Sequence, residues 1–294
     1  AWNSRCITEV QCLEALMALL EKNVSTAAGR CAVRCGLFVC LLAALAGGGA
    51  VAAADFTARQ VTEAFHKATV QSPPDFSGRD LSFLDLAGID FKGASLSGAN
   101  LYGSDLTKAN LKGSNLSGVM LDRASIVSAD FSGAILAGAS LLRPSINVAL
   151  DRNPRDAPKF AGANLRGARI TAMMDGADFR GADLTDANLG PYDLRADMSS
   201  MPGSILRGSD FSGAILRRAD LMWAKLRFSK FVGADLRDVN FAGADLSKCD
   251  LSGADVTGAN LMDADLDGAI LSGVRGLDTV NGGDTIKNLA TAVR

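Results

Sequence analysis

The stretch ASLSGANLYGSDLTKANLKGSNLSG, residues 94–118, repeats one five-residue unit along its whole length. Each unit has a small residue, then Asp, Asn or Ser, then Leu, and then two residues that are often Gly, Ser, Thr or Lys. A period of five matches neither the 3.6-residue period of a helix nor the two-residue period of a plain strand. This internal repeat therefore decides the fold before any single element is considered.

The same spacing of bulky apolar residues extends over most of the region from Phe76 to Leu271. The first uninterrupted run comprises Phe76, Leu81, Leu86, Phe91, Leu96, Leu101, Leu106, Leu111, Leu116, Leu121, Ile126, Phe131, Leu136, Leu141 and Ile146. The register is lost near 147–159 and again near 195–205, where prolines favour loops because proline cannot donate to a backbone ladder. One further residue is missing after Ile170, since the next apolar centre is Met174.

Side chains alternate in an extended stretch, so each Leu shares a face with the small residue two positions before it. The Asp or Asn between them points the other way, where its short side chain can bond to the backbone of a turn. A turn after every unit closes the chain into a coil. If each side of a square coil takes one unit, a full coil takes about 20 residues and Leu96 stacks on Leu116.

Together with GADLRDVNFAGADLSKCDLSGADVTGANLMDADLDGAILSG, residues 233–273, the first stretch resembles the pentapeptide repeat proteins. The resemblance implies an all-β solenoid, a right-handed quadrilateral β-helix. We expect one β-helix over residues 73–275, with loops near 147–159 and 195–205, rather than two solenoids hinged at the first loop.

Both ends of a solenoid expose an open coil and need caps. Residues 55–72 predict a short amphipathic capping helix, with Asp55 as its N-cap and Phe65 on its apolar face. Residues 276–294 predict a C-terminal cap with a short helix that begins at Asp284.

Residues 31–54 have the features of a membrane or export segment. Arginines precede an apolar core, and the charge-free part, 36–54, has a length that is marginal for a membrane span. The alanine-rich end also fits a transfer signal that is cleaved. We favour a retained transmembrane signal-anchor, with the β-helix on the far side of the membrane by the positive-inside rule. Residues 1–30 predict an amphipathic helical segment on the near side.

A β-helix behind such a segment resembles the thylakoid lumen members of the family. The resemblance implies a chloroplast thylakoid membrane protein with its β-helix in the lumen, and a plastid transit peptide is expected before Ala1. A bacterial inner-membrane protein with a periplasmic β-helix is the alternative. We expect a non-enzymatic scaffold or structural subunit on a large membrane protein complex, with a photosystem or its antenna proteins as the suspected partner. The alternative is a soluble exported binding or regulatory protein with a cleaved signal.

The chain is close to neutral, with 32 acidic and 30 basic residues and a net charge of −2. Such a charge gives no electrostatic drive toward nucleic acid. Some pentapeptide repeat proteins are acidic rods that imitate DNA and bind type II topoisomerases. That role needs a strongly negative surface, so we do not expect it here.

The residue content also argues against an enzyme. His66 is the only histidine, so no Ser/His/Asp or Cys/His site is expected. The aspartates follow the repeat and are interpreted as turn residues rather than catalytic or metal-binding groups. Cys249 replaces Ala at a small inward position, which predicts a buried thiol. We expect no cofactor or metal, and the sequence leaves open a pigment or lipid at the membrane segment.

Candidate protein contacts are outward-facing residues of unusual type. Exposed Met, Trp and Phe beside Arg are typical of protein interfaces. The stretch 217–228 supplies Arg217, Arg218, Met222, Trp223, Arg227 and Phe228. Arg152 and Arg155 in the first loop are a second candidate contact.

Overall fold

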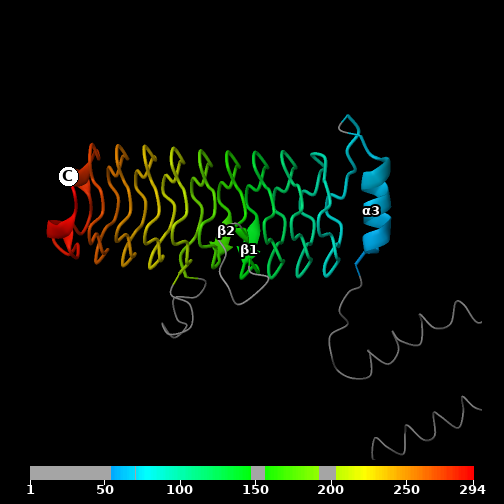
Figure 1. Ribbon diagram of the computed structural model, residues 1–294, viewed down its shortest axis with the longest axis horizontal. Helices are drawn as coiled ribbons and strands as arrows, with labels where there is room; N and C mark the ends of the chain where they lie inside the picture. Colours follow the sequence, from blue (N-terminus) through cyan, green and yellow to red (C-terminus); the bar gives the residue numbers. More distant parts are fainter. Residues whose placement is uncertain (1–53, 70, 147–155, 192–202) are drawn as a thin grey trace, which may run out of the picture. The chain divides into compact units, whose positions relative to one another are not determined.

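The computed structural model of the chain describes residues 54–69, 71–146, 156–191 and 203–294. The chain divides into two units, Ala1–Ala52 and Ala53–Arg294, and all described residues belong to the second. This second unit is a solenoid of stacked coils, with helix α3 (Ala58–Lys67) across one end and the C-terminus at the other (Figure 1). Two short parallel strands, β1 (Ser140–Leu142) and β2 (Arg169–Thr171), lie between the ends.

A parallel backbone ladder joins adjacent coils with a constant step along the chain. Asp75 pairs with Ser95, and Ser95 pairs with Asn115. The N–H of Leu96 donates to the carbonyl of Asn115 at 2.7 Å, and the N–H of Asn115 donates to Ala94 at 3.0 Å. The predicted coil length, which places Leu96 one coil before Leu116, is therefore confirmed.

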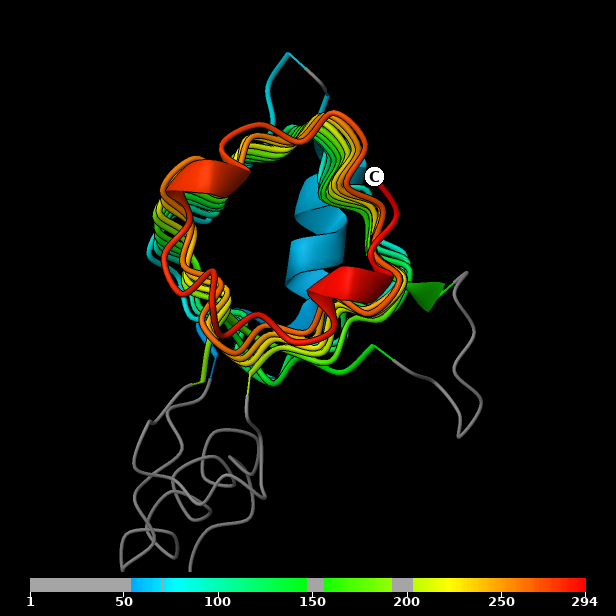
Figure 2. The ribbon, with the colours of Figure 1, turned by 90° about the vertical axis from the view of Figure 1, so that its left-hand side faces the viewer.

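Four columns of paired residues run along the solenoid, one on each side. We number the sides by a ladder residue in each, so that side 1 contains Ser95, side 2 Asn100, side 3 Asp105 and side 4 Asn110. Seen along the axis, the coils superpose around a common centre, with α3 lying across one end (Figure 2). The sheets are parallel because each coil returns to the same side in the same direction.

Each of the two breaks in the repeat lengthens a different coil, and neither break ends the solenoid. Asp130 pairs with Lys159, and Met173 pairs with Ile205, so both partners lie further along the chain than the regular step from Asp75 to Ser95. Most residues of the two expected loops lie outside the described part of the chain. Sides 1, 2 and 4 keep their pairing across the first break. The chain therefore forms one β-helix rather than two hinged solenoids.

One coil is a residue short, as the missing position after Ile170 predicts. Lys159 pairs with Asp178, one position short of the regular step. The ladder residues Arg169 and Met173 are four positions apart, where five is the rule. The missing residue therefore belongs to the turn between sides 2 and 3.

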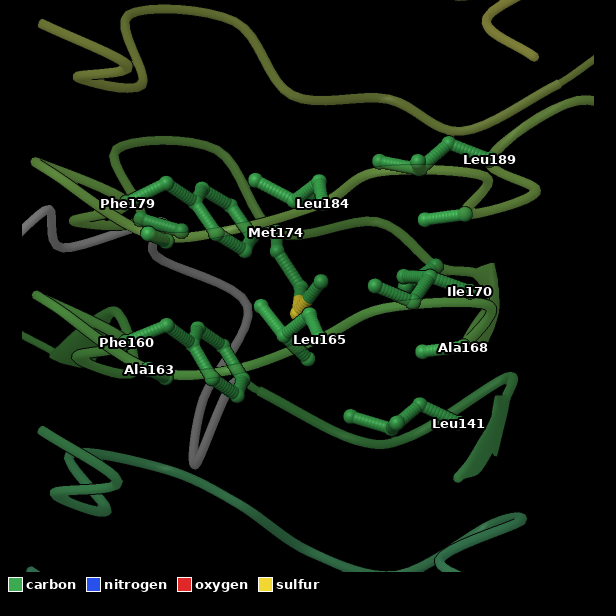
Figure 3. Close-up of a cluster of buried hydrophobic side chains, with 14 of the residues drawn as sticks. Leu141, Phe160, Ala163, Leu165, Ala168, Ile170, Met174, Phe179, Leu184 and Leu189 are labelled. Atoms are coloured by element: carbon green, nitrogen blue, oxygen red, sulfur yellow. The ribbon is translucent and has the colours of Figure 1, made fainter. Parts of the chain in front are cut away.

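The interior is filled by the apolar centres of the repeats and by the small residues two positions before them. Because the backbone ladder sets the spacing between adjacent coils, equivalent side chains on one side of the solenoid stack on each other (Figure 3). On side 4, ring centroids lie 4.7–5.0 Å apart and ring planes within 7° for Phe131, Phe160, Phe179, Phe211 and Phe231. Each buried ring is worth about 1.5–3 kcal/mol of apolar burial.

Many turns combine a side chain, often aspartate, that bonds to the turn backbone, as the repeat predicts, with a residue in the left-handed backbone conformation. Oδ1 of Asp105 accepts the backbone N–H of Thr107 at 2.9 Å, which fixes the start of a turn. The last turn residue has a positive φ, a conformation that favours glycine, as at Gly98 with 66°. The same conformation persists where the residue is large, with φ of 59° at Arg123 and 56° at Trp223.

Helix α3 begins after Thr57 with a capping box. The Thr57 hydroxyl oxygen accepts the N–H of Gln60 at 3.3 Å, and Oε1 of Gln60 accepts the N–H of Thr57 at 2.8 Å. Val61 and Phe65 are buried against the first coil. The Phe65 ring lies 4.8 Å from that of Phe91, so α3 covers the open end of the solenoid.

The prediction that Asp55 is the helix N-cap was wrong. The N–H of Asp55 donates to the carbonyl of Asp80 at 2.7 Å, and its Oδ2 accepts the N–H of Asp80 at 2.8 Å. Asp55 thus covers free backbone groups of the first coil. Lys92 Nζ donates to the carbonyls of Phe65 and Ala68 at 2.8 Å and closes the C-terminus of α3.

At the other end, the helix that we predicted from Asp284 is absent among the described residues, because 276–293 form a further coil. Lys287 pairs with Asp265, two positions beyond the regular step, so the sides of this coil are longer than those before it. Its only helical turns are two 3-10 elements, η2 (Leu277–Thr279) and η3 (Leu289–Thr291).

Three threonine hydroxyls finish the edge of this last coil: Thr279, Thr285 and Thr291. Thr285 Oγ1 donates to the carbonyl of Gly282 at 2.9 Å and accepts the N–H of Asp263 at 3.0 Å. In earlier coils a backbone carbonyl accepts the equivalent N–H, as the carbonyl of Thr257 does for Asp238. The hydroxyls therefore take the place of these carbonyls at the end of the solenoid.

None of the helices in the described part of the chain has the length and apolar character that a bilayer crossing requires. The predicted segments 1–30 and 31–54 lie outside the described residues, apart from Ala54.

Candidate functional site

The interior of the described coils is filled with apolar side chains, so groups that could bind a partner lie at the turns, the loops or the ends. Among the described residues, no three His, Cys, Asp or Glu side chains gather closely enough to hold a metal ion. The Cys249 thiol is buried and donates to the carbonyl of Leu226 at 3.0 Å. Burial raises the pKa of this thiol to about 12, so it remains protonated at neutral pH. The expected buried thiol is confirmed.

The six candidate contact residues of 217–228 lie on three different sides of one coil. Consecutive repeats occupy consecutive sides, while neighbours on one side belong to different coils. The candidates form three pairs: Arg217 and Arg218 follow side 1, Met222 and Trp223 follow side 2, and Arg227 and Phe228 follow side 3. The structure thus separates them into small groups.

The two arginines after side 1 already have carboxylate partners. Arg217 Nε donates to Asp235 Oδ2 at 2.6 Å. Arg218 binds Asp186 through two hydrogen bonds, of 2.7 and 2.8 Å. These bonds hold the pKa of Asp186 below its ordinary range and raise the pKa of the Arg218 guanidinium. Both pairs join neighbouring coils.

The pair after side 2 is less exposed than the pair after side 3. Met222 and Trp223 are half-buried. The Trp223 indole lies directly over Gly243 in the next coil, where a Cβ would collide with the ring. The glycine therefore makes room for the tryptophan.

The pair after side 3 projects further. The Phe228 side chain is 57% exposed, and the Arg227 Cζ lies 4.8 Å from its ring centroid. This distance is typical of a cation–π contact. Arg152 and Arg155, the other candidates, lie outside the described residues.

Sequence reasoning missed a group of large residues after side 2 in the first coils. The rings of Phe83 and Tyr102 meet edge to face at 5.4 Å, and Phe83 is 59% exposed. Arg123 and Arg143 follow in the next two coils on the same turn. The available signal was a large residue at the turn position that is glycine in most repeats, as at Phe83, Arg123 and Arg143.

These turns border a hollow of about 310 Å³ that opens to solvent. We call it the turn hollow; its lining residues are Tyr102, Asp122, Arg123, Leu142, Arg143 and Thr171. It adjoins the coil that is one residue short.

A family model described as pentapeptide repeats matches the chain in 8 copies, over residues 75–113, 103–138, 158–190, 204–242, 219–258 and 240–275. A search of curated proteins finds no match.

Several solved structures are similar to the chain. HetL is a pentapeptide repeat protein involved in heterocyst differentiation regulation from the cyanobacterium Nostoc sp. strain PCC 7120. It is 30% identical over 74% of this chain and 87% of its own, with a TM-score of 0.36. Rfr23 from the cyanobacterium Cyanothece 51142 is 27% identical over 41% and 90%, with a TM-score of 0.30. A protein from the Arabidopsis thaliana thylakoid lumen is 24% identical over 47% and 68%, with a TM-score of 0.18.

The family matches cover more than half of the chain and coincide with the coils that the structure describes. Their fold is a right-handed quadrilateral β-helix, a structural and protein-interaction fold. The chain therefore belongs to the pentapeptide repeat family.

Proposed function

We propose that this chain is a non-enzymatic scaffold that binds other proteins through the outer faces of its β-helix. The filled interior carries this proposal, because it leaves side chains free to act only at the turns, the loops and the ends. An enzyme would need several polar groups converging in a concave site. Arginine and aromatic side chains on the turns instead suit protein contacts.

The separation of the candidates onto three sides makes the docking face testable. We expect the partner to cover one side, so only one of three substitutions should weaken the complex: Arg218→Gln on side 1, Trp223→Ala on side 2 or Phe228→Ala on side 3. Loss of a central aromatic or arginine contact costs about 2 kcal/mol or more, roughly a 30-fold fall in affinity.

The measurement is affinity purification of the full chain from membranes, followed by mass spectrometry of the proteins that accompany it. Val232→Ala on side 4 is the matched control, since Val232 is also an exposed turn residue. Equal partner recovery with all four variants would show that the 217–228 contacts are not used. Arg152 and Arg155 would then be the next candidates to substitute.

We further propose that residues 36–54 tether the chain to the thylakoid membrane, with the β-helix in the lumen on a photosystem–antenna complex. The support is the charge-free length of this segment and the basic residues before it. A bacterial inner membrane and periplasm are the alternative location. The alternative function is a soluble exported binding or regulatory protein with its signal removed.

Extraction of native membranes distinguishes the tethered form from the soluble form. We expect the chain to resist high salt and to require detergent, with residues 31–54 present in its mass spectrum. Release by salt alone, together with a mature N-terminus near Asp55, would contradict the tether and favour the soluble protein.

A further inference from the structure

We propose that the turn hollow binds a small organic oxyanion, a carboxylate or phosphate group joined to an apolar group. This site is separate from the protein docking proposed above. The size of the hollow, its two arginines and its apolar wall support this proposal.

The hollow adjoins the short turn between Arg169 and Met173, because Thr171 of that turn is one of its lining residues. Backbone bonds stack its turns on each other, because Arg123 N–H donates to Leu142 at 2.9 Å and Arg143 N–H donates to Thr171 at 2.7 Å. The turn that carries Arg143 therefore rests on a turn that is one residue short.

Two cationic side chains border this space without partners. In the residues that the structure describes, neither Arg123 nor Arg143 forms a side-chain ion pair or hydrogen bond, although both are exposed. Several turn arginines in later coils are paired with a carboxylate, as Arg180 is with Asp178 at 2.7 Å. A guanidinium presents a planar fork of donors that matches a carboxylate or phosphate.

The one carboxylate of the hollow is already used. Oδ1 of Asp122 accepts the Ser140 hydroxyl at 2.6 Å and the Leu142 N–H at 2.9 Å. These bonds hold the carboxylate against β1. The lining of the hollow therefore has two guanidinium groups and one engaged carboxylate, and the surplus positive charge favours an anion.

Tyr102 and Leu142 give the hollow an apolar wall. Phe83 packs edge to face on Tyr102 and steadies that ring. A volume of about 310 Å³ lies at the lower end of the range for small-ligand sites. The geometry thus points to a ligand with one oxyanion and one small apolar or aromatic group.

The test is calorimetric titration of the full chain in detergent at low ionic strength, where screening is weak. The probes are phenyl phosphate and benzoate, which combine an aromatic ring with each kind of oxyanion. We expect saturable binding of at least one probe to the wild type. Arg123→Gln and Arg143→Gln should each weaken it by about 10-fold or more, through loss of charge-assisted hydrogen bonds.

Lys108→Gln is the matched control. Lys108 is an exposed cation at the same turn position, with a φ of 58°, but it follows side 3 away from the hollow. Its substitution should leave the affinity unchanged. The proposal is overturned if neither probe binds saturably, or if both arginine variants bind the probes as tightly as the wild type. Equal affinity for inorganic phosphate and phenyl phosphate would overturn the requirement for an apolar group.

Discussion

At the scale of single residues, aspartate fixes the turn that follows it within the same coil. One oxygen of Asp178 accepts the backbone N–H of Arg180 at 3.1 Å, while the carboxylate also binds the Arg180 guanidinium. Asp105 makes the corresponding backbone bond to Thr107. Glutamate is too long for this local bond, and no glutamate occurs after Glu63.

These bonds predict a loss of stability in acid. Hydrogen bonds from neighbouring side chains lower the pKa of Asp75, Asp178, Asp186, Asp255 and Asp267. A carboxyl with a lowered pKa in the folded state stabilises the fold above its unfolded pKa of about 3.9, and this contribution is lost as the pH falls through the folded value. We expect the urea midpoint, followed by circular dichroism of the full chain, to stay level from about pH 7 to 5 and to fall below about pH 4. A midpoint unchanged down to about pH 2 would contradict this account.

At the scale of elements, the two ends of the solenoid are closed by different means. Helix α3 covers the first coil by packing Val61 and Phe65 on it, and Lys92 fixes the helix C-terminus. The last coil has no helix packed on it among the described residues. Its threonine hydroxyls instead satisfy the N–H groups of the coil before it.

Substitution of Thr285 tests this second closure. Thr285→Val keeps the shape of the side chain but removes the hydroxyl that binds Asp263 and Gly282. We expect a local loss of about 1 kcal/mol, seen as roughly fivefold faster hydrogen exchange at the Asp263 amide. Thr285→Ser retains the hydroxyl and serves as the control. If the valine and serine variants exchange at the same rate, the hydroxyl does not hold the edge.

At the scale of the whole molecule, the repeat made most of the fold predictable. A local rule that places Leu96 inward applies to every unit, so the coil length and the short coil after Ile170 follow from counting. The ends were harder to predict because they break the rule. Asp55 and Thr57 are both residue types that suit an N-cap. Asp55 instead binds the backbone of Asp80 in the first coil, and Thr57 is the N-cap. The final six-residue units GLDTVN, GGDTIK and NLATAV are visible in the sequence, but their hydroxyl bonds depend on the coil beneath.

The candidate contacts lie on different sides of the solenoid for a geometric reason. Arg218, Trp223 and Phe228 are close in sequence, yet each belongs to a different side. On a coil, residues that share a face belong to successive turns of the chain. For the same reason the turn hollow is hard to predict from the sequence, because Tyr102, Arg123 and Arg143 line one hollow only when the chain is coiled.

The short turn between Arg169 and Met173 has a further consequence when the solenoid is regarded as a crystal in one dimension. A perfect lattice presents the same surface at every step, so a ligand attracted to it would bind at many equivalent positions. A vacancy removes that equivalence. A ligand that needs the vacancy binds at a single lattice position, with a stoichiometry of one per chain, whatever the number of coils on either side.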